Sequence, residues 1–476
     1  MLAMLMSFGA GLHAQETHTF TLEQAIEYGL ENNLTIENAR FDEYIANSRV
    51  KEVLASGYPQ LSGTVEPQAF LQLPKTILPG DFSPEQELVL VQRADGGVQP
   101  IPVTKINPET GMPIPGDPIE AVFGYPIQFT AGANLNQLLF DGTFFLGVKA
   151  AKSYTGLAHK QLNRTREETA YAISQAYYQA LITAERSKIV DANVGRVEQL
   201  FRETEGLFQE GFVEKLDVDR LRINLNNLYL EQSKVTRLEA LTLNLLKYQM
   251  GMPLEDEVIL EVELDTLIEN REPTQLTANE LNLNQRIDYQ LLESQRELEE
   301  YDLRRIKAGY LPSVYLFGSY QYQYQGEPND LTDNQFDLTG LWFPLSLVGV
   351  TVNVPIFDGL RKHQQAQQSR LELEKIDNQF QLLEQGARLE YEQASTELEN
   401  AYATLLSTER TRDLAQQVYE TTRLKYREGV GSSLEVNEAE SQLKEAEANY
   451  LSSMLEYLLT QTELAKARGD FSRYHE

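Results

Sequence analysis

The 476-residue sequence contains no cysteine and only five histidines. The absence of cysteine excludes disulfides, thiolate metal sites, cysteine nucleophiles and an acylated N-terminal cysteine. No histidine stands at a metal-ligand spacing, so zinc chemistry is not expected. The chain has 41 basic and 71 acidic residues, a net charge of −30. This charge would repel nucleic acid, and cations are better suited as partners.

Long apolar runs are also missing. Beyond the N-terminal start no 18 apolar residues run together, so a membrane-spanning helix is not expected, and a membrane role would require a β-barrel. Residues 1–14 form a short apolar run ending at Ala14. They resemble a signal peptide without the usual basic start, and we expect export. The alternatives are a misassigned start or a plain apolar tail.

Proline is absent from two long stretches, between residues 126 and 253 and after residue 355. An interior proline costs a helix about 3 kcal/mol, so these stretches are where long helices can form. Apolar residues recur there at steps of three and four, the spacing of helix-on-helix packing. We expect one helix from Thr143 to Phe208, about 100 Å long at about 1.5 Å per residue, and a return helix from Glu214 to Met250.

One stretch of sequence occurs twice. The segment FQEGFVEKLDV, Phe208–Val218, returns as YREGVGSSLEV, Tyr426–Val436. Gly211 and Gly429 stand where the chain must reverse, because glycine adopts positive φ easily. Each segment is therefore predicted to be the tip of a helical hairpin, one in each half of a chain with an internal repeat.

Four segments alternate apolar and polar residues with a period of two, which is typical of barrel strands with lipid on one side and water on the other. They are residues 59–67, 127–136, 313–325 and 347–357. A soluble sandwich could alternate similarly. The strand tyrosines, with Trp342 and Phe343 next to the fourth strand, would fit an aromatic girdle at a membrane interface.

Four strands cannot close a barrel with a lumen, and open sheet edges are not tolerated in lipid. A membrane-embedded chain must therefore associate with copies of itself. Residues 67–124 hold ten of the 18 prolines and are interpreted as a long external loop. A shorter loop, residues 326–341, joins the other strand pair.

Together these features resemble the outer-membrane efflux proteins, the TolC-like exit ducts of Gram-negative bacteria. The resemblance rests on LEQAIEYGLENN (Leu22–Asn33), on the paired Phe-Asp-Gly boxes in Leu138–Gly142 and Pro355–Gly359, and on the two tips. It covers essentially the mature chain, and the strong signal is the order of the motifs with nearly constant spacing.

The resemblance implies a mixed α and β fold. Long antiparallel helical hairpins would form a periplasmic α-barrel, and four strands per chain would contribute to a 12-stranded trimeric outer-membrane β-barrel. The implied partners are two further chains, outer-membrane lipid, a periplasmic adaptor and an inner-membrane transporter. The implied function is the exit duct of a tripartite efflux system for small molecules. An exit duct for type I protein secretion and, from another class, a periplasmic coiled-coil adaptor or scaffold are the alternatives.

The expected organisation follows the repeat. It comprises a signal peptide (1–14), a first repeat (15–251), an equatorial linker (252–276), a second repeat (277–469) and a C-terminal tail (470–476). The N-terminal helix is expected to open at Thr21 with Gln24 completing a capping box. Family likeness places an equatorial belt in the N-terminal helix, the linker and the residues after about Arg468.

Site residues follow from the second tip. By resemblance, Tyr426 matches an aromatic that helps to hold a closed periplasmic mouth. Glu435 and Glu438 match acidic residues around the entrance, and Asp217 matches an acid of the first tip that joins the latch. Some members have an arginine where this chain has Gly431. A latch that depends on a salt bridge from that arginine cannot form here.

An acidic ring at a narrow mouth would attract cations. A structural role is the alternative, because Ser432 and Glu435 also form a capping-box sequence. For Asp217 no serine precedes at the right spacing, so a capping role is less expected.

The tips themselves match surfaces that family members present to adaptor hairpins, and exposed apolar tips tend to mark interfaces. The residues concerned are Glu210, Gly211, Phe212, Glu428, Gly429 and Val430. No nucleophile and base pair, phosphate loop or metal cluster occurs in the sequence. We therefore expect neither an enzyme nor a bound cofactor.

Overall fold

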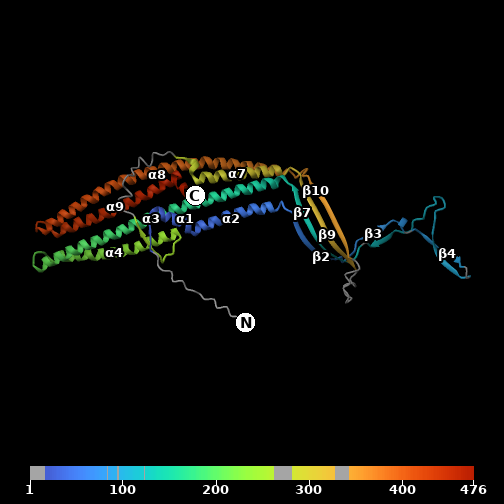
Figure 1. The fold of residues 1–476 in the computed structure, drawn as a ribbon, viewed down its shortest axis with the longest axis horizontal. Coiled ribbons are helices and arrows are strands. Elements are labelled where there is room, and N and C mark those ends of the chain that lie inside the picture. The colour runs from blue at the N-terminus through green and yellow to red at the C-terminus, as the bar shows by residue number, and fades with distance from the viewer. Residues whose placement is uncertain are drawn as a thin grey trace, which may run out of the picture. The chain divides into compact units, whose positions relative to one another are not determined.

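The computed structural model describes residues 17–82, 84–93, 96–122, 124–261, 281–326 and 342–475. The predicted signal peptide, most of the predicted linker 252–276 and residues 327–341 of the second loop lie outside these ranges. The chain divides into two compact units (Figure 1). A helical unit contains Met1–Glu52, Leu146–Lys307 and Gly359–Glu476, and a strand unit contains Val53–Phe145 and Ala308–Asp358.

The proline-free stretches form the expected long helices. Helix α3 has 68 residues and α8 has 67, and each is followed by a 36-residue return helix, α4 or α9. The helices are α1 Leu22–Asn32, α2 Leu34–Ala55, α3 Gly142–Gln209, α4 Lys215–Met250, α7 Ile287–Ala308, α8 Arg361–Arg427 and α9 Ser433–Arg468. Among the described residues, no helix combines the length and the apolar character needed to cross a membrane.

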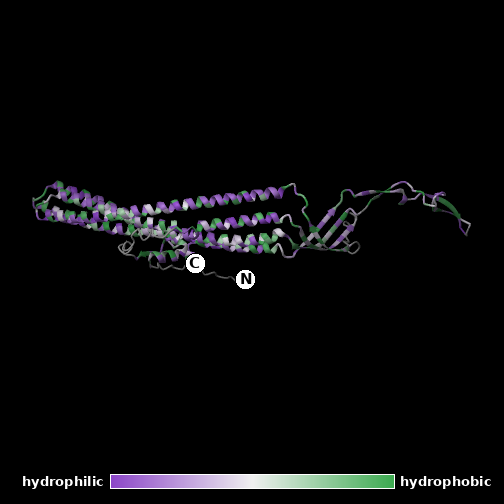
Figure 2. Ribbon diagram, turned by 90° about the horizontal axis from the view of Figure 1, so that it is seen from above, coloured by the Kyte–Doolittle hydropathy of each residue, from purple (hydrophilic) through white to green (hydrophobic). Residues whose placement is uncertain are grey.

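Helix α1 begins as predicted. The Thr21 hydroxyl accepts the Gln24 N–H at 3.4 Å, and the Gln24 side chain accepts the Thr21 N–H at 3.0 Å, which completes the capping box. Helices α2 and α7 end at Ala55 and Ala308, each four residues before a proline. Hydropathy colouring shows the helices as largely hydrophilic, with apolar residues interspersed (Figure 2).

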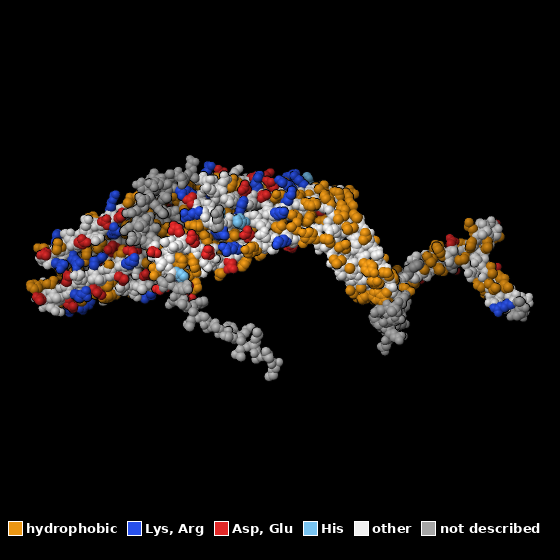
Figure 3. All heavy atoms as spheres, viewed as in Figure 1, with side chains coloured by type: hydrophobic (Ala, Val, Ile, Leu, Met, Phe, Trp, Pro, Cys, Tyr) orange, Lys and Arg blue, Asp and Glu red, His pale blue; other side chains and the backbone are white. Residues whose placement is uncertain are grey.

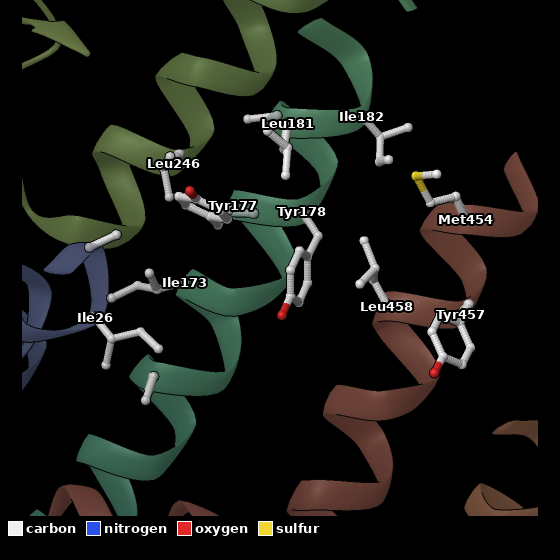
Figure 4. Packing of buried hydrophobic residues seen from close by; sticks show 14 of the residues in the cluster. Ile26, Ile173, Tyr177, Tyr178, Leu181, Ile182, Leu246, Met454, Tyr457 and Leu458 are labelled. Carbon is white, nitrogen blue, oxygen red and sulfur yellow. The ribbon is translucent and has the colours of Figure 1, made fainter. Parts of the chain in front are cut away.

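The main core of the helical unit draws on segments far apart in sequence. Ile173 and Tyr177 of α3 pack with Leu246 of α4, Ile26 of α1 and Leu458 of α9 (Figure 4). The Tyr177 hydroxyl also donates to the Phe20 carbonyl at 3.2 Å, so a deeply buried hydroxyl has its partner.

Both ends of the described chain join this core. Strand β1 (Thr17–Phe20) pairs in parallel with β8 (Glu257–Leu260). The 3₁₀ segment η4 (Asp470–Tyr474) brings Phe471, which is buried in the same core. A second 3₁₀ segment, η2 (Leu283–Gln285), precedes α7. The described parts of the three segments predicted to form a belt therefore share one hydrophobic core.

The strand unit contains a four-stranded antiparallel sheet in the order β10-β9-β7-β2. Its strands are β2 Gln60–Ala69, β7 Ile127–Phe140, β9 Ser313–Gly326 and β10 Trp342–Asn353. All four predicted strands are present. Trp342 and Phe343, predicted to lie next to the fourth strand, lie inside it.

The register aligns the predicted apolar residues across strands, because residues paired in register share a face. One row joins Leu61, Leu135, Gly318 and Val348, and another joins Val65, Ala131 and Tyr322. We call this the apolar face. In the space-filling view, hydrophobic side chains gather over the strand unit and charged ones over the helices (Figure 3).

The opposite face is polar over three of the four strands. The Gln321 side-chain amide donates to Asn134 at 3.3 Å, and Asn134 donates to the Thr64 hydroxyl at 3.2 Å. Strand β10 departs from the pattern at its start, where Leu345 and Leu347 pair in register with Gln321 and Ser319. The alternation predicted from Val348 onward is present up to Asn353, and β10 both begins and ends earlier than the predicted residues 347–357.

Residues 67–124 connect β2 to β7, and they contain regular structure that the sequence analysis did not predict. After the end of β2 they contain β3 (Lys75–Leu78), η1 (Gly80–Phe82), β4 (Gln86–Gln92), β5 (Val98–Thr104) and β6 (Ile119–Val122). Strand β3 pairs with β6, and β4 pairs with β5. Prolines flank β3, precede β6 and lie within β5 at positions 100 and 102, where a strand needs no ladder donor. A segment with the composition of a loop therefore contains two short ribbons.

Gly251 provides a test of the packing at the end of α4. It has φ of 73°, and an added Cβ would lie 2.6 Å from the Asn32 carbonyl oxygen. We expect Gly251→Ala to lower the free energy of unfolding by at least about 1–2 kcal/mol, the cost of a left-handed alanine, as measured by urea titration in detergent. Gly195→Ala is the control, because its Cβ meets nothing within 4 Å and should stabilise α3 by about 0.5–1 kcal/mol. Equal shifts for both variants would contradict this account.

Candidate functional site at the hairpin tips

The two tips have the same backbone geometry. At the first, the Gly211 N–H donates to the Phe208 carbonyl at 3.0 Å and the Phe212 N–H to Leu207 at 2.9 Å. At the second, Gly429 donates to Tyr426 at 3.1 Å and Val430 to Lys425 at 3.0 Å. Both are Schellman caps, which place a residue with positive φ after the helix. The φ values of 81° and 77° explain why both positions are glycine, and each turn joins a long helix to its return helix.

The outermost apolar side chains of the tips are uncovered. Phe212 is 75 % exposed and Val430 is 80 % exposed. Glu210 and Glu428, which precede the two glycines, are also exposed. Phe212 does not fold back onto its own hairpin, so each tip presents one acidic and one apolar side chain to its surroundings.

Tyr426 points inward from α8. It is 7 % exposed, and its hydroxyl forms a hydrogen bond of 3.1 Å with the Thr204 hydroxyl, which is fully buried on α3. Its ring packs with Leu200 and Leu221 of the first hairpin and with Val436 of α9. Tyr426 therefore connects the two hairpins just behind the tips.

Asp217 forms a second connection. Its carboxylate accepts a hydrogen bond from the Ser433 hydroxyl in the first turn of α9. It also accepts the Glu214 N–H at 3.4 Å and lies 4.0 Å from the Arg220 guanidinium. A capping role, which the sequence made less expected, is therefore present, because an acid in the first helical turn can bond back to the N-cap backbone.

Glu435 and Glu438 lie at the start of α9 and are exposed. The Ser432 hydroxyl accepts the Glu435 N–H at 3.3 Å, so the serine caps α9 as its sequence indicates. Within the described part of the chain, neither carboxylate takes part in an ion pair. Their side chains are therefore available to water and ions, unlike that of Asp217.

A buried polar cluster behind the tips was missed by the sequence reading. The Arg196 guanidinium of α3 contacts Glu447 of α9 at 3.1 Å. The Asn224 amide of α4 donates to Glu440 of α9 at 3.2 Å. Burial raises the pKa of Glu440, while the bond from Asn224 and the nearby Arg196 act in the opposite direction. Polar groups at this depth require such partners.

The signal for this cluster is present in the spacing. Val436, Glu440, Leu443, Glu447 and Tyr450 step by four and three along α9, so two acids occupy an otherwise apolar stripe. Acids in such a stripe predict buried partners on a facing helix. The identity of those partners is not encoded locally, since they lie more than 200 residues away in the chain.

Known proteins resemble this chain in sequence. Residues 280–470 match the sequence model of the outer membrane efflux protein family. The chain is also 18 % identical over 343 residues to the outer membrane protein TolC of Vibrio cholerae, covering 72 % of this chain and 77 % of that protein.

Through these matches the chain is similar to the TolC-like outer membrane efflux proteins. Proteins of that family are channels, and the matches indicate the outer membrane of a Gram-negative bacterium as the location.

Solved structures share the fold. The CmeC outer membrane channel of Campylobacter jejuni gives a TM-score of 0.66 at 16 % identity over 94 % of this chain and 85 % of its own. VceC of Vibrio cholerae gives 0.64 at 17 % identity over 94 % and 96 %. The open state of the Neisseria gonorrhoeae MtrE channel gives 0.65 at 15 % identity over 94 % and 88 %.

The Tyr426 connection can be tested against a matched neighbour. Tyr426→Phe leaves the buried Thr204 hydroxyl without this partner, so we expect a loss of about 1–2 kcal/mol in the free energy of unfolding. Tyr419 lies one heptad earlier on α8, also buried, and its hydroxyl has no hydrogen-bond partner among the described residues. Tyr419→Phe should be neutral or stabilising. Urea titration of both variants checks this, and a larger loss at Tyr419 would refute it.

Proposed function

We propose that the protein is the outer-membrane exit duct of a tripartite efflux system. Three chains would each contribute four strands to a 12-stranded barrel, and their helical hairpins would form a tunnel through the periplasm. The observation that carries the proposal is the four-stranded sheet, which combines an exposed apolar face with two open edges.

The exposed apolar face suits lipid. Three residues of this face, Leu61, Val65 and Val348, are 75 %, 65 % and 78 % exposed in the single chain. A water-soluble sheet would bury such a face against a second layer. The polar face, with Thr64, Asn134 and Gln321, would then line a water-filled lumen.

The open edges require copies. Among the described residues, β2 and β10 each pair with one neighbour in this sheet, β7 and β9 respectively. Unpaired backbone N–H and C=O groups cost several kcal/mol each in lipid. Pairing β2 of one chain with β10 of the next would satisfy both edges, and three chains of four strands give the proposed 12.

Aromatic side chains support the membrane orientation. At one end of the sheet the Trp342 ring lies 5.5 Å from Phe129 and 5.6 Å from Tyr324, centroid to centroid. Near the other end of β7, Phe145 lies 6.1 Å from Phe140 and 5.5 Å from Phe144. Aromatic girdles at both interfaces are typical of outer-membrane strands.

The paired hairpins support an internal repeat. Helices of 68 and 36 residues form the first, and helices of 67 and 36 residues form the second. We assign the repeats to residues 15–251 and 277–469. Three chains would supply six hairpins to a tunnel wall, and the net charge of −30 per chain would favour passage of cations.

The tips are proposed to dock onto a periplasmic adaptor that links the duct to an inner-membrane pump. Exposed Phe212 and Val430 provide apolar anchors, and Glu210 and Glu428 provide a charged rim. Gly211 and Gly429 hold the turns that present them. Cargo choice would belong to the pump, so small molecules are proposed as cargo and secreted proteins are the alternative.

The gate is proposed to lie just behind the tips. Tyr426 and Asp217 each bond across to the other hairpin, so they would hold the two hairpins of one chain together. Glu435 and Glu438 are free to face the entrance. In three copies they would form an acidic ring that concentrates cations.

The proposal is tested by purifying the protein in detergent. We expect particles of three chains, stable without a partner protein, that conduct ions after insertion into planar bilayers. A scaffold protein would instead leave the membrane fraction on washing with salt, without detergent. Monomeric particles with no conductance would overturn the proposed duct.

The acidic ring makes its own prediction. The combined Glu435→Gln and Glu438→Gln variant should reduce the preference for cations, measured as a shift of reversal potential towards zero in a salt gradient. Glutamine keeps the size and the helix start, so assembly should be unchanged. The combined Glu31→Gln and Glu37→Gln variant removes two exposed acids elsewhere and should not shift it. An unchanged potential in the first variant would rule out the ring.

A further inference from the structure

The extension between β2 and β7 has no role in the duct described so far. Its ribbon, strands β4 and β5, is defined here as residues 86–92 and 98–104. Every residue of β4 is exposed, and among the described residues β4 and β5 form a sheet of their own. A single two-stranded ribbon is marginally stable in water, so its composition should reveal what stabilises it.

Both faces of this ribbon are apolar. One face carries Leu88 and Leu90, which are 70 % and 69 % exposed and stand opposite Pro102 and Pro100. We call it the leucine face. The other carries Val89, paired with Ile101, and Val91, all about 40 % exposed. We call it the valine face.

The two faces together indicate two contacts. A ribbon that packed on one surface would keep a polar outer face, as antiparallel sheets do. An apolar patch left in water on either side would mark an interaction site. Each face of the ribbon is therefore expected to pack against another surface. The two contacts differ, because one is made by leucine and proline and the other by valine and isoleucine.

Symmetry indicates which molecule packs against the two faces of the ribbon. In a two-fold pair the same patch meets itself, so the second face would remain bare. In a closed ring each copy offers one patch and receives another. A ribbon with two different apolar faces is suited to a ring, and the proposed duct already arranges three copies around one axis. The extension also follows directly from β2, an edge strand of the sheet at which the next chain is proposed to bind.

The contact would be made by side chains rather than by added strands. Pro100 and Pro102 have no N–H, and since they stand opposite Leu90 and Leu88 they occupy ladder positions that give nothing to β4. The outer edge of β5 therefore lacks donors at these positions, a common protection against strand addition. A ring built edge to edge is disfavoured, and face-to-face packing remains.

We propose that the ribbons of three chains pack face to face into a closed collar, with the leucine face of each against the valine face of the next. The collar rests on the proposed function for its three-fold axis. It would brace the outer mouth of the barrel, since the extension lies between two barrel strands.

The cysteine-free sequence makes the test direct. In the L88C/I101C variant the two thiols stand on opposite faces of one ribbon, so they cannot join within a chain. Oxidation of the purified protein in detergent should convert most chains into a covalent three-chain species. The single variants L88C and I101C should give no covalent dimer, because like faces do not meet. L88C/E120C, with its second thiol on β6 outside the ribbon, is the matched control and should give no three-chain species.

The outcomes separate the collar from the duct. Covalent trimers in the double variant alone support the collar. Dimers of L88C alone would mean a two-fold contact and overturn it. Three-chain, conducting particles that do not cross-link would overturn the collar and leave the duct intact, whereas monomeric particles would overturn the duct. Cross-linking in intact cells to a chain of another mass would assign the ribbon to a different partner and also overturn the collar.

Discussion

A strand at the edge of a sheet carries a row of backbone N–H and C=O groups that lipid cannot satisfy. In this protein β2 and β10 have such edges, and the sheet between them has an apolar face exposed in the single chain. Both features become favourable when copies pair edge to edge. The proposed trimer, the lumen lined by the polar face and the hairpin tunnel all depend on this pairing.

The helical unit solves a different problem, the alignment of very long helices. Apolar stripes alone would allow hairpins to slide, since many registers bury similar area. Here polar residues interrupt the stripes at matching heights, and Thr204 meets Tyr426 while Arg196 meets Glu447. A slip of one turn would leave these groups buried without partners, at a cost of about 1–3 kcal/mol each. The polar contacts therefore define which register is stable, and they lie where the proposed gate would move.

Much of the fold could be predicted from sequence because its signals are local and long. Proline-free stretches with steps of three and four identify α3 and α4 to within one residue at each end, and strict alternation identifies β7. The extension was misread because prolines lie beside or within its short strands and the β4–β5 ribbon has apolar residues on both faces, a pattern without a clear period. Strand β10 was read only in part, since its alternation changes phase before Val348.

The position of the candidate site could be predicted from the sequence, but the hydrogen-bond partners of its residues could not. The repeated tip motif predicts where Tyr426 and Asp217 lie. It does not predict that they bond to Thr204 and Ser433, because those residues are more than 200 positions away. Likewise, the bond from Asp217 to the Glu214 backbone depends on cap geometry rather than on residue type.

The core that joins β1, β8 and η4 has a consequence for biogenesis. Thr17 pairs with Glu257, and Phe471 completes the same core close to the C-terminus. During synthesis the first strand thus has no mate until β8 has emerged, and the core lacks an apolar contact until Phe471 has followed. Contacts of such long sequence separation form slowly, so the nascent polypeptide must be kept from aggregating until it is complete.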